Sequence, residues 1–240
     1  MSVTVYTENW NGLFKKSTFE AVSYAYETAK LLGSSVTAIS LGEVTNEELT
    51  KLGEYGASKI LSYPNLKKED SKAAVIDFAK LRDNTQVYIF SNSYTSKMIA
   101  PRLSAKLKYG FVSNVISIPL SIKPITVKKT SFSSKAIEKV KLTTDKCIIS
   151  ISPNSYKVIK NPCNPKIELI ESISEQNIII EGQEKAKGKI ALSEAEIIVS
   201  AGRGLKGPDN WKMIEKLADL LGAATACSKP VSDIGWRPHS

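Results

Sequence analysis

The first half of the sequence alternates short β-branched strand patterns with amphipathic helical patterns, and this alternation restricts the possible folds more than any other feature. The strand patterns cover residues 3–6, 36–41, 59–62, 86–90 and 111–118, and the helical patterns lie between them at 17–32, 47–55, 71–81 and 96–107. In 17–32, apolar side chains recur at helical spacing up to Gly33, a common helix terminator. This alternation is typical of βαβ units and predicts an α/β fold, a parallel sheet with helices on both faces.

The strand and helix rhythm changes after Pro119. Residues 125–130, 136–142, 147–151 and 157–159 resemble strands with no helix between them, which predicts an antiparallel β extension. Two more apolar runs lie within 167–180, and the polar, glycine-containing stretch 181–189 is the predicted linker. We therefore expect an amino-terminal α/β domain at 1–189 and a smaller domain at 190–240. Within the first domain, Pro101 is predicted to kink or briefly interrupt the helix at 96–107.

A glycine turn follows the predicted linker. A strand pattern at 196–200 leads into Gly202–Gly207, which has the spacing G-x-G-x-x-G, and a helical pattern runs from Pro208 to Leu221. Glycines let a backbone turn tightly and approach a diphosphate, and a helix N-terminus offers free N–H groups to an anion. The spacing alone leaves a nucleotide or flavin site and a plain tight turn as alternatives, and Arg203 favours the former.

The net charge of +9 is concentrated in the middle of the chain. Nine lysines and no arginine lie between Lys123 and Lys160, where the acidic residues are Glu138 and Asp145. Specific nucleic-acid readers favour arginine forks and aromatic stacking, so a solvated strand face is the favoured interpretation and no nucleic-acid partner is expected. Lysines on an exposed edge also block edge-to-edge pairing of sheets.

The cysteine and histidine content excludes several familiar chemistries. Cys147, Cys163 and Cys227 form no C-x-x-C pair, which argues against a disulfide framework and a zinc site and favours a reducing, cytoplasmic setting. The sequence has a single histidine, His239, which argues against a Ser-His-Asp triad and a histidine-rich metal site. The sequence has no long apolar run and no signal pattern, so neither export nor membrane insertion is expected.

Several sequence runs resemble the alpha subunit of electron transfer flavoproteins. VSAGRGLK at 199–206, LAD at 217–219, LGAA at 221–224 and SKPVSDIGW at 228–236 resemble the start of that subunit's FAD-binding domain. KMIAPRLSAKL at 97–107 resembles the Pro-Arg helix of its first domain, and the lysine-rich stretch resembles its β extension. The resemblance implies an adenine nucleotide alpha hydrolase-like first domain followed by an incomplete, doubly wound FAD-binding domain.

The resemblance also implies a function. Members of this family take electrons from flavin-dependent dehydrogenases and pass them to a quinone reductase or another acceptor, as heterodimers with a beta subunit. They are electron carriers rather than enzymes that turn over a substrate. The chain ends where the family continues into its FAD loop, so we expect a truncated subunit with an incomplete FAD site.

Individual site residues follow from the same resemblance. Gly202 and Gly204 form the turn, Arg203 supplies a positive charge beside FAD, and Ser228 supplies a hydroxyl within hydrogen-bonding reach. Lys229 stands where the family has arginine, which keeps the charge but loses the planar fork. We expect no catalytic residue and no metal.

Two other functions remain as alternatives. The first is a stand-alone nucleotide-binding α/β domain that uses the carboxyl ends of its strands around 7–13 and 91–96. That domain shows no phosphate-binding glycine loop, which weighs against this alternative. The second is a basic module that binds nucleic acid through 123–160.

Overall fold

A computed structural model describes residues 2–182, 192, 195 and 197–238. The chain divides into two compact units, Met1–Ile179 and Ile180–Ser240, and each is described by itself. The boundary expected between residues 189 and 190 lies outside the described residues and stays a prediction.

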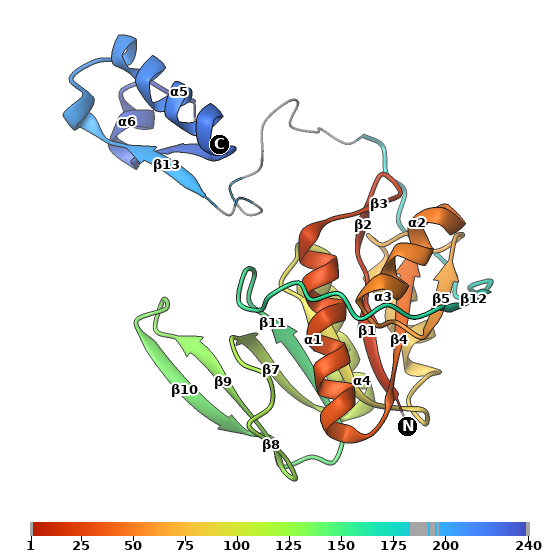
Figure 1. Cartoon of the computed structure of the whole chain (residues 1–240). Helices are drawn as coiled ribbons and strands as arrows, with labels where there is room; N and C mark the ends of the chain where they lie inside the picture. Colours follow the sequence, from red (N-terminus) through yellow and green to blue (C-terminus); the bar gives the residue numbers. More distant parts are fainter. Residues whose placement is uncertain (1, 183–191, 193–194, 196, 239–240) are drawn as a thin grey trace. The chain divides into compact units, whose positions relative to one another are not determined.

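The first unit is built on a ten-stranded sheet in the order β10-β9-β7-β11-β6-β1-β4-β5-β12, with β8 paired to β9 (Figure 1). The strands from β7 to β12 in this order are parallel, which confirms the predicted α/β fold. Their bounds are β1 Ser2–Tyr6, β4 Ser35–Leu41, β5 Lys59–Tyr63, β6 Thr85–Ser91, β7 Gly110–Val115, β11 Cys147–Ile151 and β12 Lys166–Leu169. A separate small hairpin is formed by β2 Asn9–Trp10 and β3 Leu13–Phe14.

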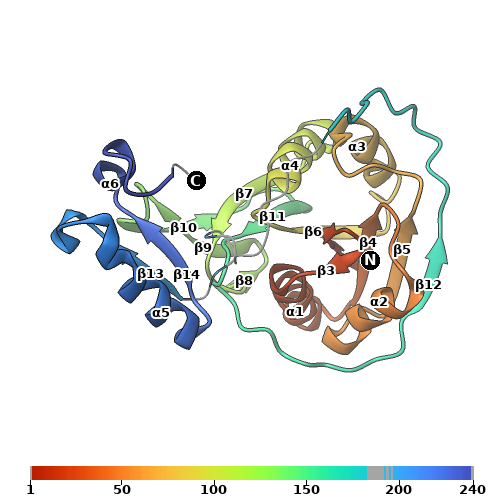
Figure 2. The ribbon, with the colours of Figure 1, turned by 90° about the horizontal axis from the view of Figure 1, so that it is seen from above.

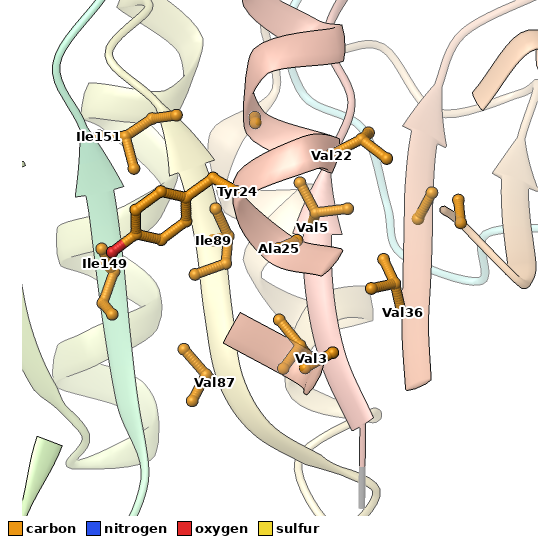
Figure 3. Close-up of a cluster of buried hydrophobic side chains, with 14 of the residues drawn as sticks. Val3, Val5, Val22, Tyr24, Ala25, Val36, Val87, Ile89, Ile149 and Ile151 are labelled. Atoms are coloured by element: carbon orange, nitrogen blue, oxygen red, sulfur yellow. The ribbon is translucent and has the colours of Figure 1, made fainter. Parts of the chain in front are cut away.

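Helices cover both faces of this sheet, as the sequence predicts (Figure 2). One face packs against α1 Lys16–Leu32, α2 Asn46–Thr50 and the 3-10 turn Lys51–Tyr55. The other face packs against α3 Ser71–Ala79 and α4 Tyr94–Leu107. The alternation of side chains along a strand produces this arrangement. Val3 and Val5 of β1 lie under α1 (Figure 3), whereas Tyr6 contacts Phe78 with ring centroids 5.7 Å apart.

Two helices show how local sequence and packing set their ends. Gly33 adopts φ 61° and donates its N–H to the last turn of α1, as expected of a helix terminator. α4 starts at the Ser93 cap and continues through Pro101 without a break. Proline removes one backbone hydrogen bond, and the full burial of Ile99 and Leu103 in the core offsets this loss, so the predicted interruption does not occur and the predicted kink stays a prediction.

The predicted antiparallel extension is smaller than the sequence suggested. It consists of β8 Ser121–Ile122, β9 Ile125–Ser131 and β10 Ala136–Lys141, which pair antiparallel. The prediction was wrong for β11, which returns to the parallel sheet between β6 and β7. All five of its residues are buried, and such a strand needs cover on both faces.

Residues 157–159 are not a strand, contrary to the prediction. The Ser23 hydroxyl of α1 instead exchanges hydrogen bonds with the backbone of Ile159 at 3.1 and 3.2 Å. The chain then crosses to the far edge of the sheet, where β12 pairs parallel with β5.

The second unit has the expected order of strand, glycine turn, helix and strand. Its elements are β13 Ile198–Ala201, the 3-10 turns Arg203–Leu205 and Pro208–Asn210, α5 Trp211–Leu221, β14 Ala224–Cys227 and α6 Lys229–Asp233. β13 and β14 are parallel, with Ala201 opposite Cys227. Across both units, the helices of the described residues are all too short or too polar to cross a membrane.

Candidate functional site

The glycine turn and Ser228 meet at the carboxyl ends of β13 and β14. The Ser228 N–H donates to the Ala201 carbonyl at 3.0 Å, which extends the pairing of the two strands to the start of the turn. A Cβ atom placed on Gly202 would lie 3.5 Å from the Ser228 Oγ. The structure therefore brings together two residues that are 26 positions apart and that the sequence assigned to one site.

The turn holds its own shape through backbone hydrogen bonds. The Leu205 N–H donates to the Gly202 carbonyl at 3.2 Å, and the Lys206 N–H donates to the Arg203 carbonyl at 3.0 Å. The Asn210 side chain donates to the Leu205 carbonyl at 2.6 Å and ties the turn to the start of α5. The N–H groups of Gly202, Arg203 and Gly204 donate to no other residue in the part of the chain that the structure describes, so they are available to a ligand.

The electrostatics of this edge favour an anion. Arg203, Lys206 and Lys229 are all exposed and carry positive charge. Neither Arg203 nor Lys229 forms an ion pair with another residue in the described part of the chain. The Ser228 side chain makes no cap hydrogen bond to α6, so its hydroxyl can turn towards a ligand. Because the charges face solvent, salt will weaken their attraction.

These residues fit the diphosphate part of a dinucleotide. Gly202 is half-buried and Gly204 is exposed, so the turn lies at the surface and not in the apolar interior. An open space lies where a side chain on Gly204 would stand, so a ligand can approach this backbone closely. Sequence reasoning missed Lys206 and Asn210, although a cation inside the glycine motif and a polar residue at the helix start are visible signals.

The polar side chains at the carboxyl ends of the first unit's strands form hydrogen bonds to the protein's own backbone. The Thr7 hydroxyl donates to the Ile39 carbonyl at 2.8 Å, and the Asn9 amide donates to the Leu41 carbonyl at 2.6 Å. The Ser93 hydroxyl caps α4. This edge therefore gives the alternative of a stand-alone nucleotide-binding domain little support.

No cluster of three or more histidine, cysteine or acidic side chains that could hold a metal ion occurs among the described residues.

Comparisons with known proteins agree with the division of the chain into two units. Residues 3–176 match the family model for the electron transfer flavoprotein domain, and residues 191–240 match the model for the electron transfer flavoprotein FAD-binding domain. The electron transfer flavoprotein subunit alpha of Bacillus subtilis is 30% identical over 242 residues, which are 98% of this chain and 74% of that protein.

Two further relatives show the range of the similarity. The subunit alpha of Syntrophomonas wolfei is 26% identical over 244 residues, which cover 98% of this chain and 75% of that protein. The lactate dehydrogenase (NAD(+),ferredoxin) subunit LctC of Acetobacterium woodii is 26% identical over 253 residues, with 98% of this chain and 59% of that protein covered.

Proposed function

This chain belongs to the electron transfer flavoprotein family as an alpha subunit, and we propose that it binds FAD at the carboxyl ends of β13 and β14. In this proposal it works with a beta subunit, accepts electrons from flavin-dependent dehydrogenases and delivers them to a quinone reductase or another acceptor. It is a cytoplasmic electron carrier and does not itself turn over a substrate. The juxtaposition of Gly202 and Ser228, where cationic residues gather, supports this assignment most directly.

Each site residue has a role in binding. Gly202 and Gly204 let the backbone approach the FAD diphosphate, and Arg203 places a positive charge beside it. The Ser228 hydroxyl donates a hydrogen bond to the cofactor, and Lys229 adds a second positive charge. Bound FAD would supply the reversible uptake of electrons. The chain's own residues bind and orient it.

The assignment is tested with the complex of this chain and its beta subunit. The purified complex should retain FAD, seen in its visible absorption spectrum, and a complex that stays colourless after FAD is added contradicts the proposal. Arg203→Ala should weaken FAD binding by about tenfold, the equivalent of losing one charge-assisted hydrogen bond. Lys212→Ala, which removes an exposed charge from α5, is the matched control and should bind FAD normally.

The chain without a beta subunit should bind FAD weakly. The described part of its second unit pairs two strands, β13 and β14, and this leaves little surface to enclose a flavin. Fluorescence titration of FAD with the isolated chain measures this affinity. Tight, stoichiometric binding would show that these residues suffice for the site.

A further inference from the structure

The β9–β10 hairpin has two different faces. Val127 lies directly opposite Val140, and Val127 is fully buried in the core. The next pair along the hairpin, Lys128 and Lys139, must therefore point to the other face, because neighbouring residues of a strand alternate. Lys141 lies on that face too, two residues beyond Lys139. We call Lys128, Lys139 and Lys141 the hairpin lysine face.

This face has no negative charge to balance it. The single acidic residue of the hairpin, Glu138, is opposite Lys129 and so lies on the other face. None of the three lysines forms an ion pair with another described residue. Like charges directly opposite each other destabilise a hairpin. The repulsion between Lys128 and Lys139 therefore lowers the stability of the hairpin.

Apolar side chains stand exposed beside these lysines. Ile137 shares their face, as the partner of Thr130, and is 66% exposed. Phe132 at the tip of the hairpin is 82% exposed. Phe132, Ser133 and Ser134 adopt φ angles of 53°, 52° and 64°, the left-handed region that non-glycine residues rarely enter. This strained tip holds a large apolar side chain in solvent, which is a common property of a binding element.

We propose that the hairpin lysine face, together with Phe132 and Ile137, docks an acidic protein surface that has an apolar recess. The carboxylates would compensate the lysines, and the recess would cover the two apolar side chains. A second copy of this chain does not fit, because pairing two such faces brings lysines together. Nucleic acid fits less well, because the face has no arginine for base recognition or phosphate forks. The proposal does not depend on the flavin site.

The test measures binding of defined probes to the full chain by fluorescence anisotropy at low salt. The first probe is a labelled peptide with the repeat Glu-Glu-Leu-Glu, and the second replaces each leucine with serine. The third is a short DNA duplex. The leucine peptide should bind more tightly than the other two, and raised salt should weaken it.

Two variants locate the binding. Lys128→Glu combined with Lys139→Glu should weaken binding of the leucine peptide by about tenfold or more. Lys72→Glu combined with Lys212→Glu, two charge reversals at exposed positions of α3 and α5, is the matched control and should bind normally. Phe132→Ser should reduce binding of the leucine peptide to the level of the serine peptide.

A stability measurement separates docking from a structural role. Lys139→Glu alone creates a cross-strand pair with Lys128, so it should raise the thermal midpoint while it weakens peptide binding. A loss of stability in this variant would overturn the argument from like charges. The proposal also fails if the leucine peptide does not bind, if the combined Lys72→Glu and Lys212→Glu control weakens its binding equally, or if the duplex binds more tightly than the peptide.

Discussion

Asp70 joins the start of α3 to the segment that follows β12, so replacing it should loosen both. One carboxylate oxygen caps α3 by accepting the Ala73 N–H at 3.0 Å. The other accepts the Asn177 N–H at 2.9 Å, from a residue 107 positions away. The side chain is almost completely buried, with 2% of the residue exposed. Because Ala73 is buried as well, water cannot readily replace the cap hydrogen bond in an Asp70→Ala variant, whereas it can reach the N–H of the exposed Asn177.

The magnitude follows from the two contacts. Loss of a helix cap costs about 1 kcal/mol, and the hydrogen bond from Asn177, an exposed residue, contributes about 0.5–1.5 kcal/mol. Asp70→Ala should thus lower the free energy of unfolding of the first unit by about 1.5–2.5 kcal/mol. Asp83, whose side chain is 82% exposed, supplies the matched control, since Asp83→Ala should change stability by less than about 0.5 kcal/mol.

The stabilisation by Asp70 should depend on pH. Burial alone would raise the pKa of this carboxyl, but N–H donors from Ala73, Asn177, Lys72 and Ile178 outweigh it and lower the pKa from 3.8. A carboxyl with a lowered folded-state pKa stabilises the fold fully above its unfolded-state value and loses this effect as pH falls through the folded-state value. The difference between the Asp70→Ala variant and the unmodified chain should therefore be constant near neutral pH and shrink below about pH 4.

Urea unfolding followed by circular dichroism checks both expectations. The unmodified chain, Asp70→Ala and Asp83→Ala are compared at neutral pH and at a series of values below 4, the region set by the ordinary carboxyl pKa. An unchanged urea midpoint for Asp70→Ala at neutral pH would refute the coupling between α3 and the later segment. If the stability difference between Asp70→Ala and the unmodified chain is as large in acid as at neutral pH, the electrostatic part of the argument is refuted.

Three further predictions test other parts of the molecule. Gly56→Ala should destabilise the first unit by about 3 kcal/mol in urea unfolding, because Gly56 has φ 105° and a Cβ there would overlap the Tyr26 ring. A midpoint equal to that of the unmodified chain would contradict it. Cys147 should resist a thiol reagent in the folded chain, because it is buried and burial raises its pKa to about 12. The exposed Cys163 should react faster, although partial burial of its thiol raises its pKa as well. Mass spectrometry of the labelled peptides measures the extent of reaction, and equal labelling of Cys147 and Cys163 would contradict the prediction. Lys229→Arg in the complex with the beta subunit should shift the flavin potential, measured by a redox titration, and leave FAD bound, whereas loss of FAD would contradict a supporting role.

The first unit's helices could be predicted because their signals are local. The apolar spacing in α1 and the glycine after it determine where the helix lies and where it ends, and the structure agrees within one residue at Lys16. The break considered at Pro101 does not occur, because the burial of Ile99 and Leu103 in the core is a property of the tertiary fold. A local rule could not weigh that contribution.

The candidate site was only partly visible in the sequence. The spacing of Gly202 and Gly204 after a strand predicts a tight turn, but it leaves the ligand open. Ser228 entered through a resemblance, and its place beside Gly202 depends on the parallel pairing of β13 with β14. The exposed positive charge of Lys206 was missed because the spacing rule treats that position as variable.

The position of β11 had a signal that the prediction did not use. Strand β10 mixes charged and apolar residues and is mostly exposed, as expected for a hairpin with one face in solvent. Residues 147–151, in contrast, read Cys-Ile-Ile-Ser-Ile and contain no charge. A short uncharged run of this kind is typical of a strand buried on both faces, and parallel sheets provide such positions. An uncharged run that follows a charged hairpin therefore indicates a return to the parallel core, where β11 lies between β6 and β7.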